Sequence, residues 1–383
     1  MAQIVEQFMA ENPDIEIQMT GNEVSQHLTK MKLAAMNDSL PDILWLEQPV
    51  AKDMAAAGYL YDLMDEAQKR GITDRLLDGM KDAAVVEGKR YGLPSEIMMS
   101  GLFYNKALFA KYDVKAPETF EELLKAVDTF NANGIVPISN GAKSNFSVWS
   151  FQGMLTRYGF FDKLDDLNSG KLSFVNDDFI HFYEKIQELR ERKAFSANIT
   201  TLDYFQAIDQ FLGGNAAMVD SGAWEVAKFE ESGMAQDIGF LFGPTFSDGV
   251  GDQKTGIKTS GGVYSVSAKV ANDPEKLDAI MKFFEFYYGD PGTKIIAEKT
   301  FNLPTTKYTG TIDADTHPVL AELLTALNDE EWKSSKEPFS YLATHVGNSL
   351  FDSIWGVING VYTPEQAAQV VKDAMMLERA KGQ

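Results

Sequence analysis

The chain has 383 residues, of which 44% are hydrophobic and 24% are charged, a composition typical of a folded protein with two or three domains. Its 56 acidic and 35 basic residues give a net charge of −21, and so acidic a surface repels the phosphates of nucleic acids and anionic lipids. The chain contains no cysteine, which excludes disulfides, thiolate nucleophiles and cysteine-bound metals.

The first elements along the chain indicate an α/β fold. Apolar residues recur at helical spacing up to Asn12, an alternating segment follows, and a second helical pattern precedes a short apolar run. The order is a helix over 1–12, a strand over 15–19, a helix over 23–36 and a strand over 43–46. A strand, helix and strand at this spacing form a βαβ unit, which predicts a parallel sheet. Two such strands make a poor sheet alone, so we expect another strand before Met1.

Helix-capping signals mark elements in the rest of the chain. Thr119 and Glu122 form a capping box, in which the two side chains satisfy amides at the helix start. The other predicted elements are helices from about 176 to 189, 205 to 212, 274 to 284 and 363 to 379, and strands over 216–219 and 263–267. The stretch 246–262 is rich in Gly, Asp and Ser, and we expect the chain to cross between domains there.

The sequence carries none of the common catalytic motifs. The GxSxG elbow, the HExxH motif and the Walker A loop are absent, and the four histidines lie far apart in the sequence. With 56 carboxylates, some pairs will be close by chance, so a glycosidase pair cannot be argued from their presence. We therefore predict no catalytic residue, no metal site and no cofactor.

Tryptophans near the ends of predicted elements are more informative. Trp224 follows Asp220 and Gly222, just after the strand predicted over 216–219. In open α/β sheets, ligands bind beyond the carboxyl ends of the strands, and an aromatic face at that place stacks on the apolar face of a sugar. A lone tryptophan is more often a core residue, but these neighbours favour a ligand contact for Trp224.

Several motifs occur in a characteristic order along the chain. They are YGLP at 91–94, FYNK at 103–106 followed by Leu108 and Phe109, PETFEEL at 117–123, FLGGNAAM at 211–218 followed by Gly222 and Trp224, Gly261 with Gly262, and TPEQA at 363–367. Together they resemble the signatures of extracellular sugar-binding proteins, the solute receptors of ATP-driven importers of the maltose and raffinose type. The resemblance covers essentially the whole chain.

The resemblance implies a periplasmic-binding-protein-like α/β fold with two lobes, each a mostly parallel sheet flanked by helices, and a ligand cleft between them. The first lobe would hold residues 1–107 and 262–307, and the second residues 108–261 and 308–383. Closure around the ligand would be a hinge motion that the importer recognises. Members of the family carry a signal segment and a strand before the opening helix, whereas this sequence begins at that helix. The implied location is extracytoplasmic, either periplasmic or as a cell-surface lipoprotein.

The resemblance also implies a set of ligand-binding residues. Trp224 would be the stacking platform. Asp220 would accept hydrogen bonds from sugar hydroxyls or, alternatively, cap the short helix at Ala223. Gly261 and Gly262 would let the backbone approach the ligand or form a tight turn. The other candidates are Ser95, Glu96, Trp45 and Glu47, with core packing the alternative for Trp45, and the aromatic residues Trp149, Phe339 and Tyr341.

The function implied is that of a non-catalytic receptor, a monomer that binds a carbohydrate, most simply an oligosaccharide, and delivers it to the permease subunits of an ABC importer. Nucleic acid is not an expected partner. One alternative keeps the fold but binds a polyamine or another non-sugar solute. Another is a hydrolase that acts on sugars, against which the absence of a catalytic motif argues.

Overall fold

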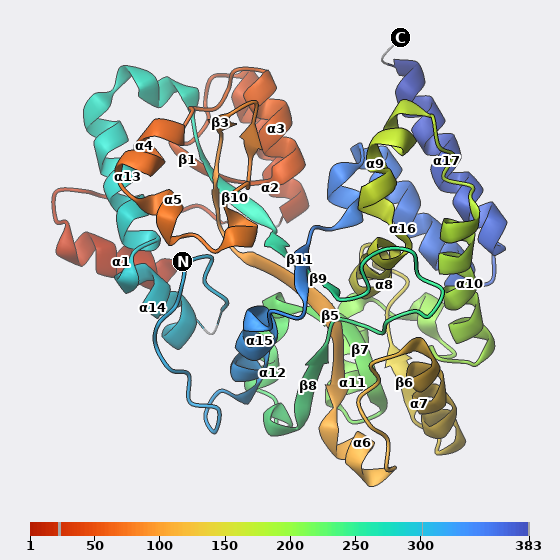
Figure 1. Ribbon diagram of the computed structural model, residues 1–383. Coiled ribbons are helices and arrows are strands. Elements are labelled where there is room, and N and C mark those ends of the chain that lie inside the picture. The colour runs from red at the N-terminus through yellow and green to blue at the C-terminus, as the bar shows by residue number, and fades with distance from the viewer. Residues whose placement is uncertain (22–23, 301, 382–383) are drawn as a thin grey trace. The chain divides into compact units, whose positions relative to one another are not determined.

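The computed structural model describes residues 1–21, 24–300 and 302–381. The chain forms two compact units (Figure 1). Unit 1 comprises Met1–Met98 and Thr259–Ile312, and unit 2 comprises Met99–Lys258 and Asp313–Gln383. The chain therefore passes from one unit to the other after Met98, after Lys258 and after Ile312.

Unit 1 consists of seven α-helices, a three-stranded sheet and a separate two-stranded sheet within the described residues. The helices are α1 (Ala2–Glu11), α2 (Val24–Met36), α3 (Gln48–Ala56), α4 (Met64–Lys69), α5 (Ile72–Arg75), α13 (Pro274–Tyr287) and α14 (Asp290–Lys299). The strands are β1 (Ile43–Glu47), β2 (Val85–Val86), β3 (Lys89–Arg90), β4 (Leu93–Pro94) and β10 (Gly262–Val266). Two 3-10 turns, η1 (Asp78–Met80) and η6 (Ala268–Asn272), complete it. The helix predicted to start at residue 23 is α2, and residue 23 itself lies outside the described residues.

The three-stranded sheet of unit 1 is antiparallel, so the parallel βαβ unit predicted for this region is wrong. Strand β10 lies between β1 and β4 and runs against both, with Trp45 opposite Tyr264. Residues 15–19 are not a strand: Ile17 donates its amide to the Met9 sulfur instead, at 3.4 Å. Alternation predicts which side chains can share a face, but a strand also needs a hydrogen-bonding neighbour. The partner of β1 comes from a distant part of the sequence.

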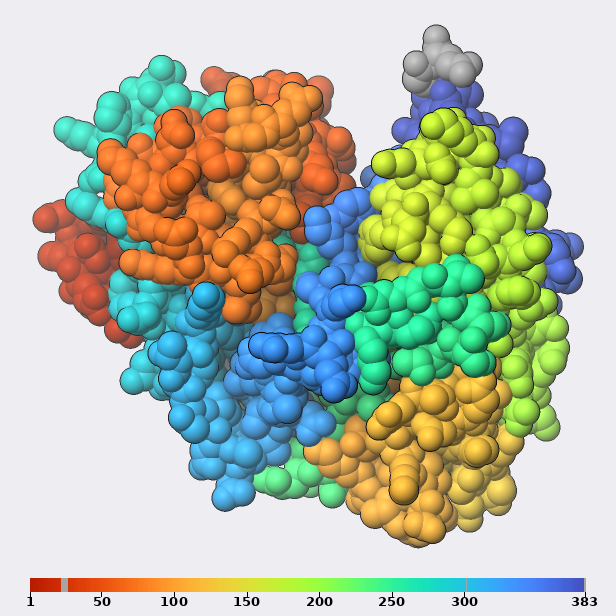
Figure 2. All heavy atoms as spheres, viewed as in Figure 1, coloured from red at the N-terminus to blue at the C-terminus, as the bar shows by residue number. Residues whose placement is uncertain are grey.

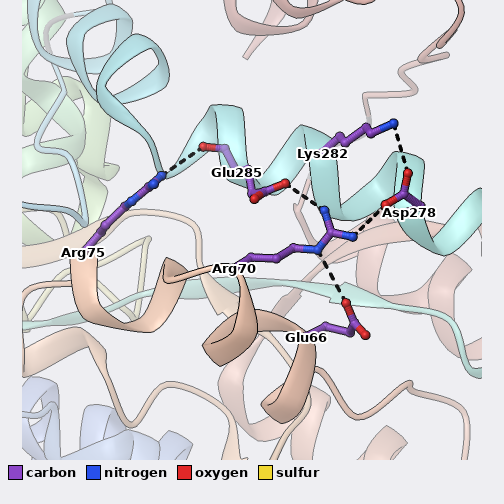
Figure 3. Close-up of polar contacts among 6 residues, drawn as sticks. All are labelled: Glu66, Arg70, Arg75, Asp278, Lys282 and Glu285. Carbon is purple, nitrogen blue, oxygen red and sulfur yellow. Dashed lines mark hydrogen bonds and ion pairs between the residues drawn. The ribbon is translucent and has the colours of Figure 1, made fainter.

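Helix α13 packs against α1 through aromatic rings and is joined by ion pairs to the residue that follows α4. The predicted amphipathic first helix is confirmed: Phe8 is 1% exposed, and its ring meets Phe283 and Phe286 with centroids 5.3 and 5.5 Å apart. Arg70, directly after α4, bonds Asp278 and Glu285 of α13, each at 2.7 Å (Figure 3). These ion pairs join segments that lie far apart in the sequence.

Unit 2 is larger and carries a mixed sheet. Its helices are α6 (Lys106–Lys111), α7 (Phe120–Ala132), α8 (Trp149–Met154), α9 (Phe160–Ser169), α10 (Asp177–Glu191), α11 (Tyr204–Leu212), α12 (Val226–Glu230), α15 (Pro318–Asn328), α16 (Thr344–Ile358) and α17 (Pro364–Lys381). Its strands are β5 (Ile97–Asn105), β6 (Val136–Ser139), β7 (Ala216–Gly222), β8 (Ile238–Leu241), β9 (Thr255–Ser260) and β11 (Lys333–Ser335), of which β5 and β9 begin or end in unit 1. The 3-10 turns are η2 (Leu155–Tyr158), η3 (Ile199–Thr201), η4 (Ala223–Glu225), η5 (Ala235–Asp237) and η7 (Pro338–Tyr341).

Strand order in unit 2 is β11-β9-β5-β7-β6, with β8 also paired to β5. Strands β6 and β7 are parallel, as are β11 and β9, whereas β5 runs against β7 and β8. All seven residues of β7 are buried. The predicted α/β class is confirmed, but the sheets are antiparallel and mixed rather than mostly parallel.

Large aromatic side chains fill the core of unit 2, including Phe130, Phe151 and Phe179, each 0% exposed. In Figure 2 the dark blue atoms of α17 lie against the yellow-green atoms of α9 and α10, and α16 packs on α10 and α17. The predicted capping box at Thr119 and Glu122 is present at the start of α7. The helices predicted from 176, 205, 274 and 363 are also present, as α10, α11, α13 and α17.

Candidate functional site

The carboxyl end of β7 presents two indoles. Strand β7 ends at Gly222, and Trp224 follows in the 3-10 turn η4, half-buried. Trp149 begins α8, and its ring centroid lies 4.6 Å from that of Trp224, with the two planes inclined by 57°. The structure therefore brings together two of the predicted site residues, which are distant in the sequence.

Three further rings extend this group, and the sequence analysis missed all three. Tyr204 begins α11, and its ring meets Trp149 edge-on, with centroids 5.4 Å apart. Phe146 lies 5.3 Å from Trp149, and Phe205 lies 5.2 Å from Tyr204. Phe146 is 44% exposed and Phe205 62%. We call Phe146, Trp149, Tyr204, Phe205 and Trp224 the aromatic cluster.

Hydrogen bonds fix the Trp224 side of the cluster. The Trp224 indole N–H donates to the Tyr204 hydroxyl at 2.8 Å, and that hydroxyl lies 2.7 Å from the Ser221 hydroxyl. The indole covers the place that a side chain at Gly222 would occupy, so even a methyl group there would collide with it. Gly222 therefore lets the ring lie directly over the strand end.

Asp220 is buried beneath this surface. It is 1% exposed, and its carboxylate accepts hydrogen bonds from the Ser150 amide at 3.0 Å and the Ser150 hydroxyl at 2.6 Å. Burial raises its pKa to about 7, although the bonds from Ser150 act in the opposite direction. The N-cap of η4 is Gly222, with no side-chain cap bond, so the predicted alternative of a cap at Ala223 is wrong. Asp220 instead ties β7 to the first turn of α8, next to Trp149.

In unit 1 the structure brings Trp45 together with Ser95 and Gly262. The Trp45 indole N–H donates to the Ser95 hydroxyl at 2.9 Å, and the indole covers the place of a side chain at Gly262. Tyr287, at the end of α13, donates its hydroxyl to the Ser95 carbonyl at 2.8 Å. Trp45 is half-buried, so part of its ring is open to solvent.

Two carboxyl groups stand close to Trp45 in the chain or in space. Glu47 ends β1. Desolvation raises the pKa of its carboxyl group, and the opposing effect of the Lys32 charge is smaller. Glu96 follows Ser95 and is exposed, yet the protein atoms around its carboxyl displace enough water to raise its pKa. The Gly261 amide donates to the Glu96 carbonyl at 3.4 Å. Acceptors for hydroxyl groups thus accompany the indole.

Phe339 and Tyr341 lie in η7 and pack against other helices of unit 2. Phe339 meets Phe351 with centroids 5.1 Å apart, and Tyr341 meets Phe161 at 5.3 Å. In the described ranges, no group of three or more His, Asp or Glu is placed to hold a metal ion. No helix in the same ranges is long and apolar enough to cross a membrane.

Comparison with known proteins gives relatives along most of the chain. The multiple sugar-binding protein of Streptococcus mutans is 23% identical over 395 residues, which cover 96% of this chain and 87% of the relative. The maltodextrin-binding protein MdxE of Bacillus subtilis is 25% identical, with 78% of this chain and 68% of the relative covered. A structure solved in work on xylan utilization by Caldanaerobius polysaccharolyticus superposes with a TM-score of 0.83 at 28% identity, covering 97% of this chain and 95% of that one.

The model of one protein family also matches this sequence. That family is the bacterial extracellular solute-binding proteins, and the match extends over residues 1–294. These residues include most of unit 1 and the part of unit 2 that carries the aromatic cluster. The chain therefore belongs to the bacterial extracellular solute-binding protein family.

Proposed function

We propose that the protein is an extracytoplasmic receptor that binds an oligosaccharide and hands it unchanged to the permease subunits of an ABC importer. The observation that carries the proposal is the aromatic cluster at the carboxyl end of β7, in which two indoles meet within 4.6 Å. Two relatives support it through their names, one for multiple sugars and one for maltodextrin.

The cluster suits a ligand with several apolar faces. The C–H face of a pyranose packs well on an indole, because both are flat and weakly hydrated. Phe146 extends the aromatic surface beyond Trp149, and Phe205 extends it beyond Tyr204. Both phenyl rings expose apolar surface to water, which is unfavourable unless a ligand covers it. A ligand that covers both rings has to be longer than one sugar ring.

The remaining predicted site residues have different parts in this proposal. Asp220 is too deeply buried to touch a ligand, so it positions α8 and Trp149. In unit 1, Glu47 and Glu96 accept hydrogen bonds from sugar hydroxyls, and Trp45 offers its open part for packing. Ser95 serves by holding Trp45.

A polyamine is the alternative ligand, since two carboxyl groups near Trp45 could pair with an organic cation. Desolvation raises the pKa of both Glu47 and Glu96, and a sugar hydroxyl can donate a hydrogen bond to either carboxyl group without bringing a charge to it. We further propose that the protein is a monomer without hydrolase activity. Light scattering after gel filtration should then give a mass close to 42.5 kDa.

Calorimetric titration tests the proposal. The probes are maltotriose, raffinose, xylotriose and chitotriose, with glucose as a single ring and spermidine as the polyamine. We expect saturable binding of at least one oligosaccharide, weaker binding of glucose, and recovery of the sugar intact by chromatography. Binding of spermidine alone would favour the alternative, and release of shorter sugars would identify a hydrolase.

Trp224→Ala locates the site, and Trp332→Ala is its matched control. Trp332 is also a half-buried tryptophan of unit 2, but it packs on Phe242 with centroids 5.1 Å apart. Trp224→Ala should weaken binding of the oligosaccharide while Trp332→Ala leaves the dissociation constant unchanged. Equal losses in the two variants would remove the aromatic cluster from the proposal.

A further inference from the structure

The Tyr204 hydroxyl is the meeting point of the groups that surround Trp224. It accepts the indole N–H of Trp224 at 2.8 Å and lies 2.7 Å from the Ser221 hydroxyl. The carboxyl group of Glu225 lies near the same hydroxyl. Tyr204 is 4% exposed, Ser221 0% and Glu225 8%, so water does not readily replace any of these bonds.

The direction of the bond to Trp224 follows from the chemistry of its two groups. An indole N–H can only donate, whereas a hydroxyl group can donate or accept. Tyr204 therefore accepts from Trp224, and in its second bond, with Ser221, either hydroxyl can donate. Burial raises the pKa of Tyr204 well above its ordinary value, so the phenol keeps its proton.

Trp224 needs this anchor because of its place in the fold. It lies in the short 3-10 turn η4, and the residue beneath its ring is Gly222, which has no side chain to fix the plane of the indole. Tyr204 comes from α11, which packs on β7, and its ring also meets Trp149 at 77°. One residue of a regular helix thus contacts both indoles.

We infer that Tyr204 is a positioning residue, which holds the Trp224 indole in the orientation that a sugar ring requires. The inference rests on the proposed function, because the indole is the surface to be presented. A ring that must first be ordered costs part of the binding free energy, whereas a ring already held in place does not. Tyr204→Phe should therefore weaken the binding of the oligosaccharide by about three- to tenfold.

The test compares Tyr204→Phe with Tyr183→Phe. Tyr183 is a fully buried tyrosine of the same unit whose hydroxyl lies 2.6 Å from that of Ser353, and it belongs to α10. Each variant keeps its aromatic ring and loses one buried hydroxyl. A general effect of destabilisation should therefore appear in both variants, whereas an effect on Trp224 should appear only in Tyr204→Phe.

The readouts are the affinity for the oligosaccharide and the nuclear magnetic resonance signal of the Trp224 indole N–H, assigned with Trp224→Phe. In Tyr204→Phe we expect that signal to move upfield and its proton to exchange faster with water, both before any sugar is added. Tyr183→Phe should leave the signal and the affinity as in the wild type.

The outcomes separate this inference from the proposed function. An unchanged indole signal and an unchanged affinity in Tyr204→Phe would overturn the positioning role alone. Equal losses of affinity in Tyr204→Phe and Tyr183→Phe would also overturn it, since the effect would then be general. A wild type that binds none of the sugars would overturn the proposed function, although the indole signal would still report the hydrogen bond.

Discussion

Trp45 in unit 1 and Trp224 in unit 2 are anchored in the same way, although their surroundings differ. Each indole covers the place of a missing side chain, at Gly262 and at Gly222 respectively. Each donates its N–H to a hydroxyl group on another segment of the chain, Ser95 at 2.9 Å and Tyr204 at 2.8 Å. In both places the glycine makes room for the ring against the backbone, and the hydroxyl at the indole nitrogen fixes how the ring is oriented.

The surroundings decide what each indole can do. Trp224 lies among aromatic rings, with Trp149 at 4.6 Å, so the surface around it suits an apolar face. Trp45 is accompanied by the carboxyl groups of Glu47 and Glu96, both with a raised pKa. The comparison teaches that one way of anchoring an indole serves two kinds of surface, one aromatic and one rich in hydrogen-bond acceptors.

The largest expected effect is on the free energy of unfolding. It depends on pH and comes from Asp220, whose buried carboxyl group bonds Ser150 next to the aromatic cluster. The pKa of Asp220 rises from 3.8 to about 7 on folding, so the folded state binds this proton more tightly than the unfolded chain. The contribution to the free energy of unfolding is fully present below about pH 4 and is lost as the pH rises through about 7. At about 1.4 kcal/mol for each pKa unit, the loss is roughly 4 kcal/mol at most.

Urea unfolding of the wild type and Asp220→Asn between pH 4 and pH 8.5 measures this loss. The asparagine stays neutral, so the wild type should lose stability relative to the variant as the pH rises. Asp237→Asn changes an exposed carboxylate of the same unit. Its free energy of unfolding should depend on pH in the same way as that of the wild type. Parallel curves for Asp220→Asn would mean that this carboxyl stays ionised when buried.

The next effect separates the two indoles by their contributions to affinity. Trp224→Ala should weaken oligosaccharide binding by about 1–3 kcal/mol, or roughly 5- to 150-fold, because a stacked sugar face is lost. Trp45→Ala should cost less than about 1 kcal/mol of binding free energy, since the acceptors Glu47 and Glu96 remain. Titration of both variants with the same oligosaccharide measures the difference. A larger loss at Trp45 would reverse the assignment of the two surfaces.

The parts that could be predicted from the sequence are those set by neighbouring residues. The capping box at Thr119 and Glu122 needs only four consecutive positions, and the structure forms it at α7. The buried strand β7 was predicted from a continuous apolar run. The direction of β1 could not be predicted, because its partner β10 comes from a distant segment and strand pairing leaves no local pattern.

The candidate site divides in the same way. Trp224 was predicted as a ligand contact because it follows a strand end, which is visible locally. Tyr204 was missed, although Asp203 and Gln206 form a capping box that fixes the start of α11 at that residue. What the sequence does not contain is the contact itself: the Tyr204 hydroxyl meets Trp224 only after α11 packs on β7. Ser95 was predicted as a ligand contact, and the sequence did not indicate that its hydroxyl accepts the Trp45 indole N–H.

A methyl group added beneath each indole is a sharper test of the shared anchor. Gly222→Ala would displace the Trp224 ring, and we expect oligosaccharide binding to weaken by about 1–2 kcal/mol. Gly262→Ala would displace the Trp45 ring in the same way, with a comparable loss in the free energy of unfolding but a smaller loss of affinity. Calorimetric titration and urea unfolding of both variants give the two quantities. Wild-type affinity in Gly222→Ala would show that the orientation of Trp224 does not matter.

The smallest expected effect is at the hydroxyl that holds Trp45. Ser95→Ala leaves the indole N–H without its acceptor, which should lower the free energy of unfolding by about 1 kcal/mol. The bond from Tyr287 should persist, because it ends on the backbone carbonyl. Ser265→Ala is the matched control in unit 1, since no partner for the buried Ser265 hydroxyl is found within the described part of the chain. That variant should be at least as stable as the wild type, because an unsatisfied buried hydroxyl is costly. If Ser95→Ala and Ser265→Ala unfold alike, the hydroxyl does not hold Trp45, and the parallel between the two anchors ends at their glycines.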